Sequence, residues 1–178
     1  MLEEVVIAGF GGQGLMLMGR LLAYAGMLEG RKVAWMPSYG PEMRGGTANC
    51  TVIISSKEIA SPVVTTPKTV IAMNKPSLDK FESSIQKDGL IVLNNSLIDQ
   101  EVKRNDLKIL KVPANDIANE LGNLRVANMV TLGAYVKKSG VVKLESIFKA
   151  LEKALAGKNQ KILDLNKVAL KKGEDMSK

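Results

Sequence analysis

A glycine-rich turn near the start of the chain constrains its fold more than any other feature. Residues 9–14 read GFGGQG and contain the spacing G-x-G-x-x-G. They directly follow a β-branched run at residues 4–8 and directly precede an apolar segment with helical spacing at residues 15–28. This order of strand, glycine turn and helix is the context in which the spacing is typical of nucleotide-binding α/β proteins. The sequence therefore predicts a Rossmann-like first βαβ unit, completed by a strand at residues 32–36.

The same turn has the chemistry to hold a phosphate. Glycine adopts positive φ angles without steric cost, and its missing side chain lets an anion approach the backbone. The first turn of the following helix supplies unpaired N–H groups and the positive end of the helix dipole. Gln13 adds a side-chain amide that either donates to a phosphate or caps the loop. The alternative is that the glycines allow tight packing of the helix on the sheet and hold no ligand.

A conventional NAD site is disfavoured by the residues at the end of the second predicted strand. Dinucleotide-binding folds usually place Asp or Glu about 20 residues after the glycines, where it binds the ribose. Residues 35–38 read WMPS here, and the first acid, Glu42, lies well inside the next loop. The sequence therefore disfavours a conventional NAD dehydrogenase and leaves a phosphate-bearing ligand open.

Strands and helices alternate along the rest of the chain. The first unit implies parallel pairing of its two strands with a right-handed crossover. We predict an α/β fold with an open, mostly parallel sheet, helices on both faces and a helical C-terminal region. A single domain is expected at residues 1–172, followed by a disordered tail at residues 173–178. The remaining predicted strands are residues 47–55, 69–73, 89–93 and 108–112, and the remaining predicted helices are residues 76–85, 115–121, 124–138, 144–156 and 160–170.

Composition excludes several kinds of active site. The chain has no histidine, so it lacks the commonest general base and zinc ligand. A single cysteine, Cys50, can form neither an internal disulfide nor an iron–sulfur cluster, and its place in a predicted strand indicates a small buried side chain. We predict no catalytic residue and no metal site in this chain. The N-terminus lacks a signal-peptide pattern and no run reaches the ~18 apolar residues of a membrane span, so a cytoplasmic location is expected.

The net charge of +7 favours anionic partners such as nucleic acid, phosphorylated cofactors or an acidic protein. Lysines are dense from residue 137 onward, where we expect solvated helix faces. Nucleic-acid surfaces usually add aromatic stacking platforms, and only 4% of the residues are aromatic. We therefore expect neither nucleic acid nor a membrane as a partner.

A second loop, residues 37–46, leads into the predicted strand at residues 47–55 and carries two prolines and three glycines. It should lie at the carboxyl end of the second strand, beside the first glycine turn, where α/β sheets bind ligands. Arg44 could clamp a phosphate or pair with Glu42, and the loop could instead be a rigid subunit contact. The candidate cofactor-binding residues of the two loops are Gly9, Phe10, Gly11, Gly12, Gln13, Gly14, Ser38, Tyr39, Glu42, Arg44, Gly45, Gly46 and Asn49.

The first loop (GFGGQG) and residues 37–50 (PSYGPEMRGGTANC) together resemble the gamma subunit of 2-oxoacid:ferredoxin oxidoreductases, in the pyruvate/ketoisovalerate oxidoreductase catalytic-domain family. The second loop is most similar to the 2-oxoglutarate and 2-ketoisovalerate branch. Residues 74–77 (NKPS) and residues 128–133 (NMVTLG) also match the family pattern. The resemblance covers roughly residues 3–156.

The resemblance implies one subunit of an enzyme (EC 1.2.7.-) that converts a 2-oxoacid and coenzyme A to acyl-CoA and carbon dioxide. Thiamine diphosphate, magnesium and iron–sulfur clusters would belong to the holoenzyme, with alpha, beta and ferredoxin-like delta subunits as partners. None of them would be bound tightly by this chain alone. Ferredoxin would accept the electrons, and coenzyme A would be a co-substrate. The two loops would help to receive coenzyme A or would only contact other subunits, and the isolated chain is expected to be inactive.

Two other interpretations stay open on the sequence alone. One is a free-standing nucleotide- or flavin-binding redox protein that uses the first glycine turn. The other is a non-catalytic scaffold subunit that senses a nucleotide. Residues 94–95 (Asn-Asn) lack an upstream Gly-Asp-Gly, so they predict turn residues at a strand end and not a thiamine diphosphate motif.

Overall fold

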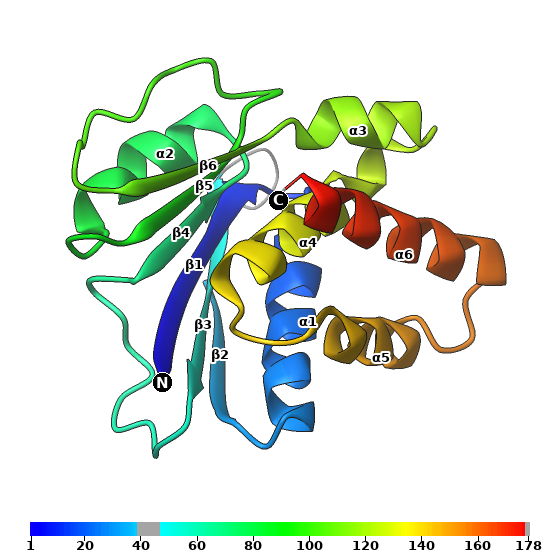
Figure 1. Ribbon diagram of the computed structural model, residues 1–178, viewed down its shortest axis with the longest axis horizontal. Helices are drawn as coiled ribbons and strands as arrows, with labels where there is room; N and C mark the ends of the chain where they lie inside the picture. The colour runs from blue at the N-terminus through cyan, green and yellow to red at the C-terminus, as the bar shows by residue number, and fades with distance from the viewer. Residues whose placement is uncertain (39–46, 177–178) are drawn as a thin grey trace.

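The computed structural model describes residues 1–38 and 47–176. Within these ranges the chain forms one six-stranded sheet in the order β2-β3-β1-β4-β5-β6, flanked by helices (Figure 1). The strands are β1 (Leu2–Phe10), β2 (Lys32–Ser38), β3 (Thr47–Ser55), β4 (Thr69–Ala72), β5 (Leu90–Asn94) and β6 (Lys108–Val112). The helices are α1 (Leu15–Leu28), α2 (Lys75–Phe81), α3 (Ala114–Glu120), α4 (Ala127–Ser139), α5 (Leu144–Ala154) and α6 (Gln160–Asp175), with short 3₁₀ turns η1 (Glu82–Ser84) and η2 (Leu124–Val126).

Every strand of this sheet except β3 runs in the same direction, which confirms the prediction of a mostly parallel sheet. β1, β4, β5 and β6 pair in parallel, and β3 pairs antiparallel with both β1 and β2. The carboxyl ends of β1, β4, β5 and β6 therefore meet at one edge of the sheet.

The pairing predicted within the first βαβ unit is wrong. β1 and β2 do run in the same direction, but β3 lies between them and is hydrogen-bonded to both. The connection from Ser38 to Thr47 is too short for a parallel return, which needs about a dozen residues or more, so the chain returns antiparallel beside β2. β3 then offers a largely buried strand to β1, and β2 is left as a half-exposed edge strand that tolerates Pro37.

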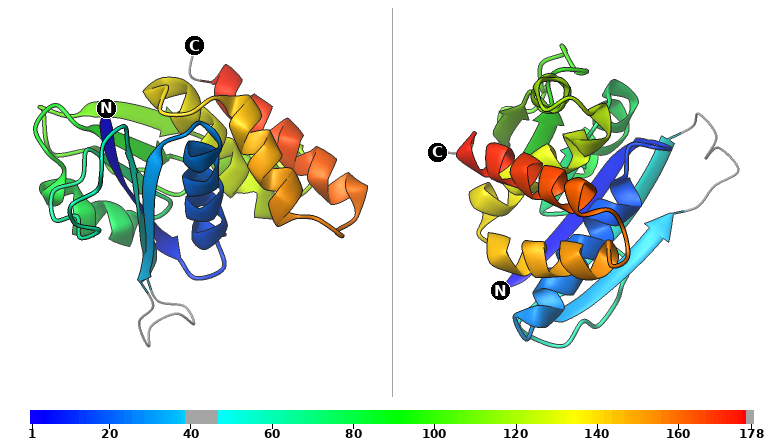
Figure 2. Two further views of the ribbon diagram at one scale, coloured as in Figure 1. Left: turned by 90° about the horizontal axis from the view of Figure 1, so that it is seen from below. Right: turned by 90° about the vertical axis from the view of Figure 1, so that its right-hand side faces the viewer.

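Helices cover both faces of the sheet, as predicted. α1, α4, α5 and α6 gather on one face, and α2 lies on the other (Figures 1 and 2). The side chains of β1 explain this arrangement, because they alternate between two apolar clusters. Val5 and Ile7 belong to the larger cluster with α1 and α4, whereas Val6 and Ala8 belong to the cluster that includes Leu78 of α2.

Most of α4 is buried, and α6 crosses it with closely spaced backbones. A Cβ atom placed on Gly133 of α4 would overlap the carbonyl oxygen of Leu170. One placed on Gly173 of α6 would overlap the carbonyl oxygen of Val130. Residues 173–175, which we expected in a disordered tail, are instead the last turn of α6. In the described ranges, no helix combines the length and apolarity needed to cross a bilayer.

A buried carboxylate joins the amino ends of the strands to α4. Glu3 of β1 is 5% exposed, and its Oε1 accepts hydrogen bonds from Thr69 Oγ1 (2.7 Å) and Tyr135 Oη (3.3 Å). Its Oε2 pairs with Lys68 Nζ at 2.8 Å. Burial, and after it the charge of Glu3, raise the pKa of Tyr135 well above the ordinary value. The phenol is thereby held protonated as a hydrogen-bond donor.

We expect the protein to lose stability above about pH 10, because Tyr135 then ionises in the unfolded chain but not in the folded protein. Because the pKa of Tyr135 is higher in the folded protein, the stability that its protonated phenol contributes is complete below the unfolded pKa. That stability is lost as the pH rises above it. Tyr135→Phe should lose about 1 kcal/mol at neutral pH with its hydrogen bond, but decline less at alkaline pH. Urea unfolding of both proteins between about pH 8 and 11 tests this prediction. The same dependence of the free energy of unfolding on pH in both proteins would contradict it.

Candidate functional site

The glycine turn lies at the carboxyl edge of the sheet, which is where open α/β sheets bind ligands. β1 ends at Phe10 and α1 begins at Leu15, so residues 11–14 form the connection. The backbone N–H of Gln13 donates to the carbonyl of Phe10 across the turn at 3.2 Å. The ends of β4 and β5 lie at the same edge because these strands are parallel to β1.

Gln13 caps the turn and ties it to the neighbouring strand. Its Oε1 accepts a hydrogen bond from the Phe10 N–H at 2.6 Å. Its Nε2 donates to the carbonyl of Met73, the residue after β4, at 3.3 Å. Gln13 therefore takes the capping role of the two that its sequence position allowed, and it positions the turn.

Asn128, at the start of α4, holds the other end of the turn. Its Nδ2 donates to the carbonyl of Gly14 at 3.3 Å, and its Oδ1 accepts from the Met129 N–H at 2.9 Å. Gly14 has φ 74°, and a Cβ atom there would overlap the Asn128 amide. The NMVTLG segment thus begins with a residue that fixes the glycine turn from the far end of the sequence. The sequence matched this segment to the family without assigning Asn128 to the site.

Gly12 is the most open point of the turn. It has φ 94°, and no described atom lies within 4 Å of the position that a Cβ would take. The first turn of α1 has no side-chain cap among the described residues and contains no acid. An uncapped helix N-terminus without an acid is the kind of end that favours an anion.

A hollow of about 170 Å³ opens beside Gly12. Arg125, in the turn η2, also lines it and is exposed. The side chain of Asn123 accepts a hydrogen bond from the Arg125 N–H at 3.0 Å and so fixes the backbone of this turn. Arg125 has no local signal in the sequence, because only the fold brings it next to a turn more than a hundred positions earlier. The hollow is lined by Gly12, Gln13, Met73, Asn115, Leu124, Arg125, Ala127 and Asn128.

Asparagines continue the polar edge towards β5. Asn94 Nδ2 donates to Asn115 Oδ1 at 2.8 Å, which links the end of β5 to α3. Asn94, predicted as a turn residue, is instead the last residue of β5, and the turn begins at Asn95. Asn74, from the NKPS segment, caps α2 by accepting from the Ser77 N–H at 2.9 Å. Asn94 Oδ1, Asn74 Nδ2 and Ser77 Oγ are buried and have no hydrogen-bond partner among the residues that the structure describes.

The other predicted site residues fall into two groups. Ser38 and Asn49 lie opposite each other in the β2–β3 pair, and Asn49 is also opposite Ala8 of β1. The structure thus brings the two ends of the second loop to the edge that carries the glycine turn. Five predicted residues lie outside the described ranges: Tyr39, Glu42, Arg44, Gly45 and Gly46.

Cys50 is a buried structural residue, as predicted from its place in a strand. Its side chain is fully buried, and its Sγ lies 3.5 Å from the carbonyl oxygen of Leu15. Burial raises the pKa of the thiol to about 11, so the reactive thiolate is scarce at neutral pH. Cys50 therefore belongs to the packing of α1 on β3.

Comparison with known proteins gives matches over nearly the whole chain. The family model described as pyruvate ferredoxin/flavodoxin oxidoreductase matches residues 4–176. Ketoisovalerate oxidoreductase subunit VorA of Methanothermobacter marburgensis is 42% identical over 98% of this chain and 36% of VorA. The 2-oxoglutarate synthase subunit KorC of Methanocaldococcus jannaschii is 33% identical over 100% of this chain and 95% of KorC. The chain thus spans little more than a third of VorA but nearly all of KorC.

Solved structures agree with these matches. The gamma subunit of a keto/oxoacid ferredoxin oxidoreductase from Geobacter sulfurreducens has a TM-score of 0.83 at 28% identity, over 98% of both chains. A 2-oxoglutarate:ferredoxin oxidoreductase from Magnetococcus marinus has a TM-score of 0.90 over 99% of this chain and 31% of that one, and at 22% identity this is a likeness of fold alone. The resemblance read from the two loops is confirmed: the chain belongs to the pyruvate ferredoxin/flavodoxin oxidoreductase family.

Proposed function

We propose that this chain is the gamma subunit of a multisubunit 2-oxoacid:ferredoxin oxidoreductase and that its glycine turn receives a phosphate group of coenzyme A. The observation that carries the proposal is the arrangement at the carboxyl edge of the sheet. There, the open backbone at Gly12 and the exposed Arg125 line one hollow, and the uncapped first turn of α1 follows the glycine turn in the chain. Backbone donors, a helix N-terminus and a guanidinium each favour a phosphate over a neutral ligand.

The relatives support the enzyme class and the subunit role. VorA and KorC are named as subunits of ketoisovalerate oxidoreductase and 2-oxoglutarate synthase. A relative from Pyrococcus furiosus, 32% identical, is named the common gamma subunit of pyruvate and ketoisovalerate oxidoreductases. The match covers 95% of KorC, which is itself named as a subunit. In VorA the matching region is continuous with further polypeptide, which supports a larger assembly around it.

The proposed complex converts a 2-oxoacid, coenzyme A and two oxidised ferredoxins to acyl-CoA, carbon dioxide, one proton and two reduced ferredoxins. Thiamine diphosphate with magnesium supplies the decarboxylation chemistry, and iron–sulfur clusters carry the two electrons. We assign both to the alpha, beta and ferredoxin-like delta partners, because this chain has a single cysteine for a cluster and no Gly-Asp-Gly upstream of Asn94-Asn95 for thiamine diphosphate. Its described residues also contain no group of three His, Cys, Asp or Glu side chains that could hold a metal.

With those cofactors on the partner subunits, the proposed role of this chain is to position a ligand. Coenzyme A carries several phosphate oxygens, which match the donors of a helix N-terminus and a guanidinium fork. Gln13 and Asn128 hold the turn in shape, because Gln13 Oε1 accepts from the Phe10 N–H and Asn128 Nδ2 donates to the Gly14 carbonyl. The second loop belongs to the same proposal through its sequence-predicted residues Ser38, Tyr39, Glu42, Arg44, Gly45, Gly46 and Asn49.

Arg125→Ala tests the proposal in the assembled enzyme. We expect the KM for coenzyme A to rise roughly tenfold, because a charge-assisted hydrogen bond is lost, while kcat and the KM for the 2-oxoacid stay nearly unchanged. Arg125→Lys should fall between wild type and Arg125→Ala. Lys158→Ala, an exposed cation in the turn between α5 and α6, is the matched control. Steady-state reduction of a viologen dye at varied coenzyme A measures these constants.

Two outcomes would redirect the proposal. An unchanged KM for coenzyme A in Arg125→Ala would mean that the hollow does not receive this ligand, and that the loops serve subunit contact. A flavin absorption spectrum in the purified isolated chain would favour a free-standing redox protein instead.

A further inference from the structure

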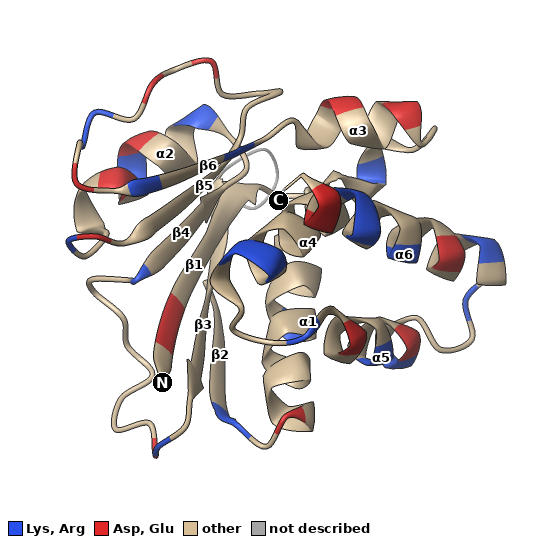
Figure 3. Cartoon of the chain, viewed as in Figure 1, with Lys and Arg blue, Asp and Glu red and all other residues tan. Residues whose placement is uncertain are grey.

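Helix α1 is unusually apolar for a helix with an exposed side. Its sequence is LMLMGRLLAYAGML, in which Arg20 is the single charged residue. A helix that is apolar on all sides is normally buried on all sides. Yet a stripe of α1 faces outward at the spacing i, i+4, i+7, formed by Arg20, Tyr24 and Met27, and Met27 is 57% exposed. Figure 3 shows the contrast with α5 and α6, which carry charges of both signs along their length.

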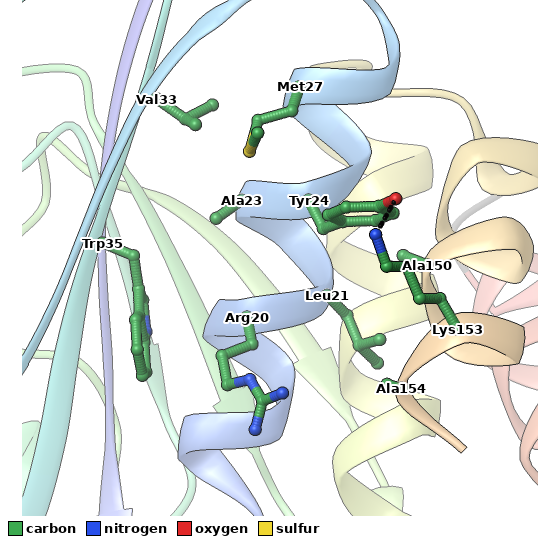
Figure 4. Close-up of a pocket in the computed structure, with 10 residues that line it drawn as sticks. All are labelled: Arg20, Leu21, Ala23, Tyr24, Met27, Val33, Trp35, Ala150, Lys153 and Ala154. Atoms are coloured by element: carbon green, nitrogen blue, oxygen red, sulfur yellow. Dashed lines mark hydrogen bonds between the residues drawn. The ribbon is translucent and has the colours of Figure 1, made fainter. Parts of the chain in front are cut away.

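A groove of about 450 Å³ follows this stripe. Figure 4 shows α1 between its two walls, with Trp35 of the edge strand β2 on one side and Lys153 of α5 on the other. Two buried residues of α1, Leu21 and Ala23, also line the groove. We call these residues the α1 groove. Its walls come from three elements of the fold, and its shape suits an apolar segment laid along a helix.

The cations of the α1 groove have no carboxylate among the residues that the structure describes. Lys153 Nζ donates to the hydroxyl of Tyr24 at 2.8 Å and lies 4.5 Å from the centre of its ring. Arg20 is exposed and makes no ion pair with any described residue. An occupant of the groove would therefore gain most if it combined apolar side chains with at least one carboxylate.

A second copy of the chain is a poor candidate for this occupant. The net charge is +7, and the lysines are dense in the C-terminal helices, so two copies repel each other. The relatives indicate a different source. VorA continues well beyond the region that matches this chain, so a larger body of polypeptide is attached to the same fold there.

We propose that the α1 groove docks an amphipathic, acidic helix of a partner subunit. This inference rests on the proposed subunit role and adds the surface and the chemistry of the contact. The apolar face of the partner helix covers Ala23, Tyr24 and Met27, and its carboxylates pair with Arg20 and Lys153. The groove lies beyond the glycine turn along α1, so the contact leaves the hollow beside Gly12 open.

Reconstitution from the separately purified subunits of the complex tests the contact. Met27→Glu and Arg20→Glu should each weaken binding to the other subunits by about tenfold or more, because one places a charge against an apolar face and the other repels a carboxylate. Val63→Glu, an exposed apolar residue between β3 and β4, should bind like wild type. The Kd of wild type should rise with salt more steeply than that of Arg20→Glu. Thermal unfolding of the isolated variants should match wild type, since both side chains are exposed.

The outcomes separate this inference from the proposed function. If both variants assemble like wild type and the complex turns over coenzyme A, the groove is not the interface, and the gamma-subunit role stands. If the isolated chain dimerises and Met27→Glu abolishes the dimer, the occupant is a second copy and the inference is wrong. If wild type does not assemble with the other subunits, the proposed function and the inference both fail.

Discussion

An aspartate in place of Gly12 is expected to raise the KM for coenzyme A by about a hundredfold in the assembled enzyme, with little change in the KM for the 2-oxoacid. Two effects act in the same direction. The carboxylate would stand in the hollow beside Arg125, where it repels a phosphate and pairs with the guanidinium that should bind it. The side chain would also fill the open space through which a phosphate reaches the backbone of the turn.

Two control variants separate these effects from simple strain. Gly12→Ala adds a Cβ at φ 94° without a charge, so it reports the backbone cost together with a small steric loss. Gly157→Asp places the same carboxylate at φ 80° in the turn between α5 and α6, where no described atom lies within 4 Å. Both should affect the KM for coenzyme A far less than Gly12→Asp. If the KM for coenzyme A in Gly12→Asp stays within about twofold of wild type, coenzyme A does not bind at the turn.

The elements that the sequence predicted well are those with strong local signals. The helix at residues 15–28 and the strands at residues 47–55 and 108–112 have the predicted bounds, because glycines or polar turns stop each apolar pattern at a definite residue. The insertion of β3 between β1 and β2 has no local signal. It depends on whether β2 or β3 packs better beside β1, which is decided by contacts between residues far apart in the sequence.

The residues of the candidate site also differ in whether the sequence gives a local signal for them. The glycine turn was predicted because its residues are contiguous and its chemistry follows from its backbone. Asn128 and Arg125 could not be assigned to it, because they join the turn only when α4 and η2 pack at the end of β1 and β4. Gln13 shows an intermediate case: the sequence limited it to two roles, and the position of the Met73 carbonyl decides between them.

Gly173→Ala is expected to destabilise the folded chain by about 3 kcal/mol, although alanine is the better helix former. On an exposed helix face the change would gain roughly 1 kcal/mol from helix propensity. Here the added Cβ would overlap the carbonyl oxygen of Val130, and both groups belong to helix backbones that move only as units. Gly133→Ala should behave alike, because its Cβ would overlap the carbonyl oxygen of Leu170 from the opposite side of the same crossing.

The double variant provides the sharper test of this crossing. Once one Cβ has pushed α6 away from α4, the second methyl group enters space that is already open. The double variant should therefore lose clearly less stability than the sum of the two single losses. Lys172→Ala, one position before Gly173 and exposed, should change the free energy of unfolding by less than about 0.5 kcal/mol. Urea unfolding at neutral pH measures all four variants. Fully additive losses would mean that the glycines act independently, and a neutral Gly173→Ala would mean that α6 is free to shift along α4 at little cost.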